Sequence, residues 1–290
     1  MRYAAPATVE EAQALLADDA DAQVFAGATD LVPQMRAGRP APSLLVDLKR
    51  IDRLISVTHE DGRWTIGAAT PTADLTRNEA FTAAFPGLSE GAGLIGSDQI
   101  QNRSSLGGNL ANASPAADSV PALIANDGQV VIATADGTRT VPAAEVATGP
   151  GHTSLADGEF IVEFTLADPP AGTGDAYLRM IPRTEMDIAI VGAAVRVTVD
   201  GDTISDATVV LGAVAPTAVV VPDAAAALVG ASVAGGTLDD SAIAALAEAA
   251  EAACDPIDDK RGTIAYRRRV AGVLARRAAA IAVERARNGA

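Results

Sequence analysis

The chain has 290 residues, of which 49% are hydrophobic, and a formal net charge of −15 at neutral pH. A chain of this length is too long for one ordinary hydrophobic core, so we predict two or three compact units. The excess of acidic residues argues against nucleic-acid binding, which requires a basic surface. A single cysteine, Cys254, excludes an intrachain disulfide and leaves too few thiolates for a zinc or iron–sulfur site. Any cluster must therefore lie on a partner chain. His59 and His152 lack the spacing of metal ligands, and we assign them no role.

The sequence lacks the features of a membrane or exported protein. No apolar run reaches the ~20 residues that a transmembrane helix needs, because Pro216 interrupts the best candidate at 209–221. The N-terminus has no apolar signal core, since acidic residues begin at Glu10. We therefore expect a cytoplasmic protein without a membrane span.

The first unit, residues 1–56, alternates helices with strands. Thr8 and Glu11 have the spacing of a capping box, and apolar residues follow at helical spacing. The pattern predicts a short helix from residue 8, a strand at 23–26, a turn at 27–29, a helix at 30–36 and a strand at 43–48. We expect an α/β subdomain here.

The second unit, residues 57–172, also mixes helices and strands and contains a glycine-rich segment. It predicts a strand at 64–68, a helix at 71–77, a helical stretch at 81–95 with a break at Pro86, a helix at 121–125, a hairpin of 129–134 with 139–141, and a strand at 159–166. Residues 91–96 match G-x-G-x-x-G, but no strand precedes them and no helix clearly opens on them, which argues against a Rossmann site.

The third unit, residues 173–290, is expected to be α+β. It predicts strands at 189–199 and 207–214, a hairpin turn at 200–202, and alanine-rich helices at 241–253 and 264–287. From Lys260 onward the chain holds nine basic residues and one acidic residue, Glu284. A basic helix on an acidic body indicates either a solvated face or a contact within a complex.

Residues 26–30 form the first segment that could carry function. A strand that enters Gly27, Ala28 and Thr29 before a helix leaves backbone N–H groups pointing out of the turn, where a phosphate can accept them. Gly27 would let the backbone approach a ligand closely. The alternative is an ordinary corner in which Thr29 or Asp30 caps the helix. Asp30 would repel a phosphate, so we expect its carboxylate to bond backbone or a sugar hydroxyl.

Residues 101–118 form the second segment, which is dense in small and amide-bearing side chains. Such a stretch gains little order from side-chain burial, so a ligand that collects its backbone donors and hydroxyls would explain it. The alternative is a long structureless surface loop, although loops of this length in compact domains are usually functional. Together, the two segments predict a dinucleotide site.

The side chains that catalysis would need are missing from the sequence. It contains no P-loop motif and no plausible cysteine–histidine pair, and its only lysines are Lys49 and Lys260. We therefore assign no catalytic residue and no metal ligand, and expect the chemistry to belong to a cofactor.

These segments resemble the medium, flavoprotein subunit of the xanthine dehydrogenase and carbon monoxide dehydrogenase family of molybdenum hydroxylases. Residues 26–31 look like the first FAD motif of the family and residues 99–118 like its second, and 148–151, 179–183 and 260–268 echo further family positions. The resemblance spans nearly the whole chain. It implies a PCMH/VAO-type (vanillyl-alcohol-oxidase) FAD-binding domain of two α/β subdomains, followed by a C-terminal domain with a small antiparallel sheet and helices.

The resemblance also implies which residues hold FAD. Gly27 to Asp30 would wrap the pyrophosphate, Gly108 and its neighbours would line the flavin side, and Ile161 and Arg179 would reach the cofactor from later strands. The full set comprises Val24, Phe25, Ala26, Gly27, Ala28, Thr29, Asp30, Leu31, Ser104, Ser105, Gly107, Gly108, Asn109, Ala111, Ser114, Asp118, Ile161 and Arg179. Because neither motif contains a histidine, we expect the FAD to be non-covalent.

Partner subunits follow from the same resemblance. It implies a small subunit with two 2Fe–2S clusters and a large subunit with the molybdopterin cofactor, as partners in a dimer of heterotrimers. Substrate oxidation would occur at molybdenum, and electrons would pass through the clusters to FAD and from this chain to an external acceptor. Since this subunit does not touch the substrate, its sequence identifies neither the substrate nor the acceptor.

Two departures from the family pattern bear on its branches. The first motif reads Ala-Gly-Ala-Thr-Asp, closer to the xanthine-dehydrogenase-like branch than to the Gly-Gly-His-Ser form of carbon monoxide dehydrogenases, which argues against carbon monoxide as substrate. Ile95 stands where some NAD-reducing relatives carry an aromatic residue, which argues against NAD as acceptor. Two other interpretations are a stand-alone flavin oxidase, for which the chain lacks a substrate domain and a base, and a non-redox binding protein.

Overall fold

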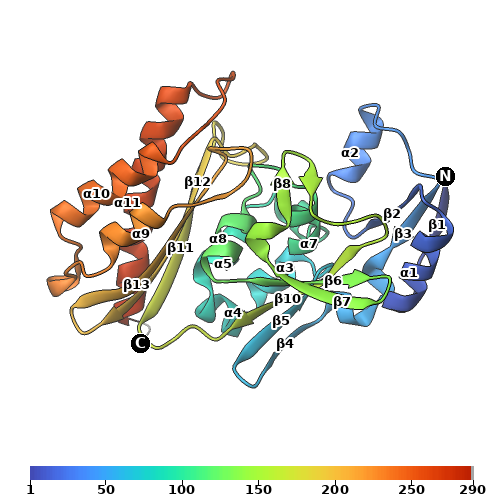
Figure 1. Ribbon diagram of the computed structural model, residues 1–290, viewed down its shortest axis with the longest axis horizontal. Helices are drawn as coiled ribbons and strands as arrows, with labels where there is room; N and C mark the ends of the chain where they lie inside the picture. The colour runs from blue at the N-terminus through green and yellow to red at the C-terminus, as the bar shows by residue number, and fades with distance from the viewer. Residues whose placement is uncertain (289–290) are drawn as a thin grey trace.

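The computed structural model describes residues 1–288 and arranges three main sheets in chain order along the long axis of the molecule (Figure 1). The N-terminal sheet lies at one end, the middle sheet with its helices follows, and the C-terminal sheet and its helices form the other end. Each sheet contributes to a hydrophobic cluster of its own.

The N-terminal sheet is parallel and has the order β1-β3-β2. Its elements are β1 (Arg2–Ala4), α1 (Val9–Asp18), β2 (Ala22–Phe25), α2 (Leu31–Arg36), β3 (Leu44–Asp47) and the 3-10 helices η1 (Leu48–Arg50) and η2 (Asp52–Ile55). The predicted helix start is confirmed, because Thr8 Oγ1 accepts a hydrogen bond from the Glu11 amide at 3.1 Å. Glu11 in turn accepts from the Ala7 amide, one residue earlier than a standard capping box.

The middle sheet is antiparallel and has the order β4-β5-β10-β6-β7. Its strands are β4 (Val57–Glu60), β5 (Arg63–Gly67), β6 (Gln129–Thr134), β7 (Gly137–Pro142) and β10 (Phe160–Ala167). The other elements are α3 (Thr72–Arg77), α4 (Glu79–Ala84), α5 (Pro86–Gly93), α6 (Asp98–Gln101), α7 (Leu106–Ala111), α8 (Ser119–Ala125), η3 (Ala143–Glu145), and the small hairpin of β8 (Ala147–Gly149) and β9 (His152–Thr153). The sequence did not predict β4.

Both faces of the middle sheet are covered. Ile66, Ile132 and Phe164 are fully buried in the cluster shared with α3, α5, α7 and α8. Phe160 and Val162 belong to the cluster that the N-terminal unit completes. The N-terminal unit therefore packs on this sheet, and the site described below lies at the junction of the two units.

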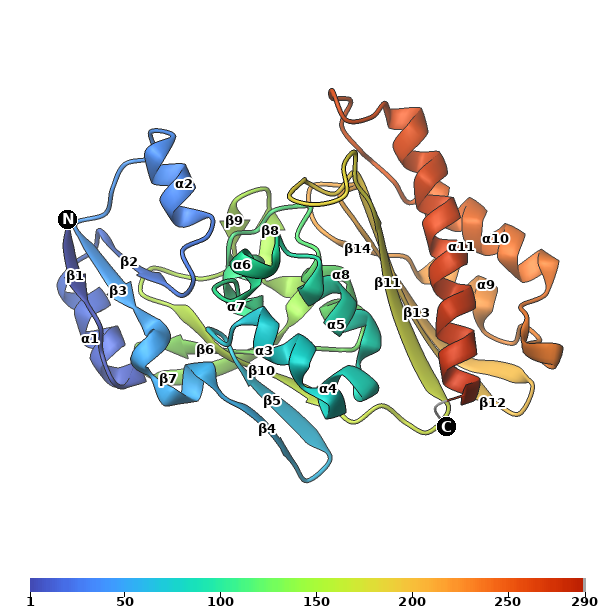
Figure 2. The same cartoon turned by 180° about the vertical axis from the view of Figure 1, so that it is seen from behind.

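The C-terminal sheet is antiparallel and has the order β11-β12-β13-β14. Its elements are β11 (Thr173–Met180), β12 (Val191–Asp200), β13 (Thr203–Gly212), β14 (Val219–Val220), α9 (Pro222–Leu228), η4 (Ala234–Gly236), α10 (Asp240–Ala252) and α11 (Ile264–Asn288). Helices α9 to α11 cover one face, whereas α5 and α8 of the middle unit cover the other (Figures 1 and 2). Strands β11 and β14 and helix α9 were not predicted.

Helix α11 lies unusually close to β11. A Cβ added to Gly174 would lie 2.3 Å from the Ala282 carbonyl oxygen, so only glycine fits at this crossing. The buried face of the helix consists largely of alanine, including Ala275, Ala278 and Ala282. None of the helices within residues 1–288 combines the length and apolar character needed to cross a bilayer.

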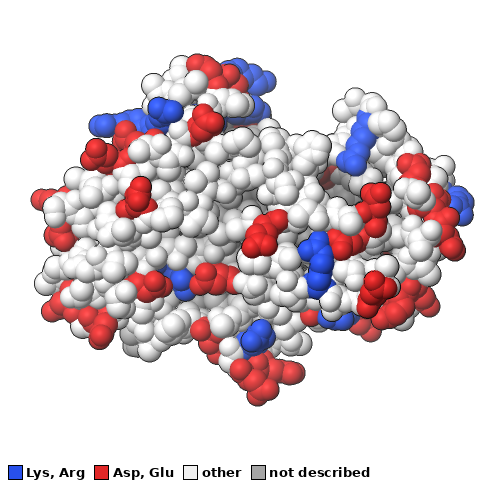
Figure 3. Space-filling view, in the orientation of Figure 1, with Lys and Arg blue, Asp and Glu red and all other residues white. Residues whose placement is uncertain are grey.

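The basic C-terminal segment is partly structural. Arg267 is 3% exposed and donates to the Ile190 carbonyl at 2.7 Å and to Asp259 at 2.6 Å. Arg285 bonds the Asp175 carbonyl and Glu90 of the middle unit. The exposed arginines of α11 include Arg268, Arg269, Arg276 and Arg277. Acidic side chains predominate over the face drawn in Figure 3, as the net charge of the chain requires.

Candidate functional site

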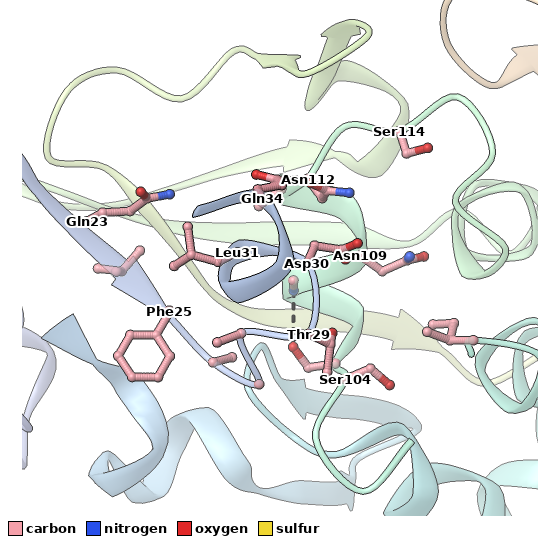
Figure 4. Close-up of a pocket in the computed structure, with 18 of the residues that line it drawn as sticks. Gln23, Phe25, Thr29, Asp30, Leu31, Gln34, Ser104, Asn109, Asn112 and Ser114 are labelled. Atoms are coloured by element: carbon pink, nitrogen blue, oxygen red, sulfur yellow. Dashed lines mark hydrogen bonds between the residues drawn. The ribbon is translucent and has the colours of Figure 1, made fainter. Parts of the chain in front are cut away.

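A cavity of about 520 Å³ lies at the junction of the N-terminal and middle units (Figure 4). One wall is the end of β2, the following turn and α2, and the opposite wall is α7 with the residues on either side of it. Gly151, between β8 and β9, lies at the rim. The volume falls in the range of roughly 300–1,000 Å³ that is usual for small-molecule and cofactor sites.

Gly27 is the point at which the two predicted segments touch. A Cβ at this position would lie 1.8 Å from the Arg103 carbonyl oxygen and 3.1 Å from the Ser104 nitrogen. Backbone cannot yield to such an overlap at low cost. The close approach that we predicted for Gly27 thus exists, but its partner is the second segment of the same chain.

The turn after β2 presents unpaired backbone donors. Within residues 1–288, no protein acceptor is recorded for the amides of Gly27, Ala28, Thr29 or Asp30. Ala28 has φ +58°, a left-handed conformation that a non-glycine residue rarely adopts and that often marks functional turns. Successive free amides in such a turn form a concavity that suits a phosphate or another anion.

Asp30 does not cap α2 with its side chain, as the alternative interpretation of this turn required. It occupies the N-cap position of α2, but neither it nor Thr29 makes a side-chain capping bond. Partial desolvation at the cavity wall raises the pKa of the Asp30 carboxyl, although the residue as a whole is exposed. The carboxyl group is therefore available to a hydroxyl donor in the cavity.

The second segment is ordered by its own packing, and the alternative of a long structureless loop is wrong. Leu106 and Leu110 of α7 are each 1% exposed. Ser105 caps α7 by accepting a hydrogen bond from the Gly108 amide at 3.1 Å. A Cβ at Gly107 would lie 2.4 Å from the Ala68 carbonyl oxygen, so this glycine fixes α7 against the end of β5.

The cavity face of α7 carries small and amide side chains. Gly108 lines the cavity, and its added Cβ would meet only one atom, Ser105 Oγ, in a close contact of 3.3 Å. Asn109 accepts from the hydroxyl of Ser119 at 2.7 Å, which leaves the amide NH₂ of Asn109 as a donor for a ligand. Both residues line the cavity, and Figure 4 shows Asn109 on the α7 side of it.

Gln34 and Asn112 join the two walls. Gln34 Nε2 lies 3.0 Å from Asn112 Oδ1, and Figure 4 shows the two side chains next to each other. Asp30 and Arg39 are the only charged residues of the lining. The site can thus hold a polar, phosphate-bearing molecule mainly through backbone and amide groups, and these residues fit the FAD pyrophosphate better than a catalytic role.

Most of the predicted cofactor residues line this cavity. They are Val24, Phe25, Ala26, Gly27, Ala28, Thr29, Asp30, Leu31, Ser104, Ser105, Gly108, Asn109, Ala111 and Ser114. The lining also includes residues absent from the predicted set, namely Gln23, Gln34, Arg39, Ile95, Asn112 and Gly151. Asn112 and Gly151 lie within segments that carried the family resemblance, whereas no local pattern identified Gln23 or Arg39.

Gly107, Asp118, Ile161 and Arg179 lie outside the lining. Gly107 packs on β5, and Ile161 is 4% exposed in the middle core. Arg179 Nη1 lies 2.6 Å from Asp118 Oδ2, and the hydroxyl of Tyr177 donates to the same carboxylate at 3.0 Å. Burial raises the pKa of Asp118 to about 6, against the opposing effects of Arg179 and Tyr177.

Comparison with protein families gives two matches that follow one another along the chain. Residues 1–168 match the FAD binding domain in molybdopterin dehydrogenase. Residues 176–282 match the CO dehydrogenase flavoprotein C-terminal domain. Both matches lie within the described part of the chain.

Similar proteins are subunits of several dehydrogenases. The 6-hydroxypseudooxynicotine dehydrogenase complex subunit alpha of Paenarthrobacter nicotinovorans is 36% identical over 98% of this chain and 95% of its own length. The xanthine dehydrogenase FAD-binding subunit of Escherichia coli O157:H7 is 32% identical over 74% of each chain. A crystal structure of carbon monoxide dehydrogenase from Hydrogenophaga pseudoflava, in a form that lacks the Mo-pyranopterin moiety, matches with a TM-score of 0.92 and 36% identity over 98% of both chains.

Proposed function

The chain belongs to the FAD-binding medium subunits of the molybdenum hydroxylases, and on that premise we propose that the cavity between α2 and α7 is its FAD site. The supporting observation is the row of unpaired amides at 27–30, in a turn that lines the cavity together with small and amide side chains of the second segment. A pyrophosphate matches these donors because each of its oxygens accepts hydrogen bonds. Asn109 would add a side-chain donor.

The residues of this chain bind and orient the cofactor and leave the redox chemistry to it. FAD, when bound, supplies a centre that can take up electrons from iron–sulfur clusters and release them to an acceptor. We assign no general base in the lining. Asp30 is the only acid there, and the described lining contains no histidine to work with it. We infer that substrate oxidation takes place on the large subunit.

The assembly follows from the family. Medium chains of this kind belong to multi-subunit enzymes, so a small subunit with 2Fe–2S clusters and a large subunit with the molybdopterin cofactor are the partners. We propose a dimer of such heterotrimers in the cytoplasm. The exposed arginines of α11 are candidates for contacts with an acidic partner surface.

The domain boundaries that we propose are those expected from the sequence, namely 1–56, 57–172 and 173–290. The two family matches, at 1–168 and 176–282, support the second boundary. The three sheets support all three units, since no main sheet takes strands from two of them.

The branch within the family and the acceptor are further proposals. The carbon monoxide dehydrogenase chain matches at 36% identity over 98% of this chain and the xanthine dehydrogenase subunit at 32% over 74%, so the motif at 26–30 alone favours the xanthine-dehydrogenase-like branch. Ile95 lines the cavity and offers no aromatic ring for stacking, which favours an acceptor other than NAD. The family assignment does not favour a stand-alone oxidase.

Two measurements test this function. The purified chain, after incubation with FAD, should be yellow and should release intact FAD on acid treatment, because the bond is non-covalent. The complex isolated from its native source should contain the chain together with an iron–sulfur subunit and a molybdenum subunit. A preparation that stays colourless after flavin addition, or an active solitary enzyme from the native source, would contradict the proposal.

A further inference from the structure

Lys49 lies directly behind the turn that carries the unpaired amides. Its Nζ lies 2.7 Å from the Ala26 carbonyl oxygen and 2.6 Å from Asp47 Oδ1. The ring of Phe25 lies beside the same ammonium, with its centroid 4.3 Å from Nζ. The side chain of Lys49 is 25% exposed, and the residue does not line the cavity.

The donors of Lys49 are already occupied by the protein. An ammonium has three N–H groups, of which one bonds Ala26 and one bonds Asp47, while the aromatic ring occupies a further side. Lys49 therefore has little capacity left to bind a ligand directly. Lys49 therefore affects the site indirectly, through its hydrogen bond to the Ala26 carbonyl.

That carbonyl determines the direction of the next amide. In a trans peptide the C=O and the following N–H point to opposite sides of the chain, and residues 1–288 contain no cis peptide bond. With the Ala26 C=O turned toward Lys49, the Gly27 N–H is turned away from Lys49. The Gly27 N–H has no protein acceptor among the described residues, and Gly27 lines the cavity.

Lys49 is itself held in place from the neighbouring strands. Asp47, at the end of β3, is 8% exposed and accepts from the backbone amide and the ammonium of Lys49. Tyr3 of β1 donates its hydroxyl to the other oxygen of Asp47 at 2.8 Å. Burial opposes ionisation of Asp47, but the hydrogen bonds from Lys49 and Tyr3 prevail and hold its pKa below the ordinary value.

We propose that Lys49 is a positioning residue for the cofactor: by anchoring the Ala26 carbonyl it directs the Gly27 amide into the cavity, where the amide binds the pyrophosphate of FAD. This inference rests on the proposed FAD site. Neither FAD motif contains Lys49, which lies more than twenty residues after Gly27 in the sequence. Its role depends on the parallel pairing of β2 with β3, which brings the two strand ends together.

The test is the substitution Lys49→Met, which keeps the side-chain stem and removes the ammonium. We expect the FAD dissociation constant to rise about tenfold or more, because a charge-assisted bond that fixes a phosphate donor is lost. Lys49→Arg should recover much of the affinity, since guanidinium can bond both acceptors. Lys260→Met is the matched control, because Lys260 is the other lysine, is exposed and lies in a different unit; it should bind FAD like the wild type.

A second measurement separates positioning from a general loss of structure. The ³¹P resonances of the bound FAD pyrophosphate should shift in Lys49→Met and stay unchanged in Lys260→Met. Thermal unfolding of the cofactor-free proteins should show whether the variant folds. If Lys49→Met does not fold, Lys49→Gln, which keeps a hydrogen-bond donor, takes its place with the same criteria.

The outcomes separate the two proposals. Wild-type FAD affinity together with unchanged ³¹P resonances in the folded variant would overturn the role of Lys49 and leave the FAD site intact. Failure of the wild-type chain to bind FAD would instead overturn the proposed site. A tenfold loss that Lys49→Arg reverses, accompanied by the shift of the resonances, would support the inference.

Discussion

Arg179 of β11 and Asp118, at the start of α8, form a buried ion pair across the boundary between the middle and C-terminal units. Nη1 lies 2.6 Å from Oδ2, and the two side chains are 6% and 10% exposed. Tyr177 donates to the same carboxylate. The resemblance placed Asp118 and Arg179 on the cofactor; in the structure they bond each other and do not line the cavity.

The first prediction concerns Arg179→Met. At pH 8 it should destabilise the fold by about 3–5 kcal/mol, because the Asp118 carboxylate is left buried without its partner. Burial raises the pKa of Asp118 to about 6, above the value of about 3.8 in the unfolded chain. A raised pKa favours the folded state most at low pH, and this contribution is lost as the pH rises through about 6. The cost of the substitution should therefore be smaller at pH 5.

Urea denaturation at both pH values measures this difference. The control is Arg183→Met, since Arg183 forms an ion pair with Asp187 but is 65% exposed. That substitution should change stability by less than about 1 kcal/mol at either pH. An equal cost of Arg179→Met at pH 5 and pH 8 would show that the protonation of Asp118 plays no part.

The second prediction concerns Gly27→Ala. The added methyl group would overlap the Arg103 carbonyl, so the two segments must separate, and we expect both a loss of about 1–3 kcal/mol in stability and a strong loss of FAD binding. Gly149→Ala is the control, because its Cβ would meet nothing within 4 Å. Thermal unfolding and flavin fluorescence titration measure the two effects. Unchanged FAD affinity in Gly27→Ala would mean that the site does not depend on this contact.

The third prediction concerns Gly108→Trp, which should abolish FAD binding without unfolding the protein. The position lines the cavity, so the indole would occupy the volume reserved for the cofactor. Gly108→Ala should retain most of the affinity. Flavin content after reconstitution is the measurement. A tryptophan variant with wild-type flavin content would refute the placement of the cofactor.

The fourth prediction concerns Gln34→Ala, which removes the bond to Asn112 between the two walls. A neutral hydrogen bond contributes about 0.5–1.5 kcal/mol, so FAD should dissociate roughly 2- to 10-fold faster. Stopped-flow displacement measures the rate. Arg36→Ala, in the same helix but outside the lining, should dissociate at the wild-type rate. Equal rates for all three proteins would exclude a retaining role for the bridge.

The local sequence correctly predicted helices that begin at a capping residue or a proline. Thr8 caps α1 as its spacing predicted, and the helical break at Pro86 coincides with the start of α5. The match to G-x-G-x-x-G at 91–96 was correctly set aside, because its first glycines lie inside α5 and no strand leads into them. In each case the residues that determine the structure lie within a few positions of one another in the sequence.

Long-range partners explain what the sequence could not show. Strand β11 was missed because its sequence mixes polar and apolar residues, and Asp175 is nevertheless 4% exposed there. It accepts from the Gly87 amide and from Asn126, which lie 88 and 49 residues away. The cavity residues Gln23 and Arg39 were missed for the same reason, since only the position of α2 across the cavity from α7 makes them part of a site. Most of the lining residues were predicted because they lie in the two FAD motifs, whose small residues are contiguous in sequence.

Gly27 of the N-terminal unit contacts Arg103 of the middle unit, so the proposed cofactor site exists only when both units have folded and are in contact. A dinucleotide that bridges these units binds the docked state and not the separate ones, so saturating FAD should stabilise their association by mass action. At a thousand times the dissociation constant, this gain is about 4 kcal/mol. Besides carrying electrons, bound FAD would thus hold the N-terminal and middle units of the subunit together.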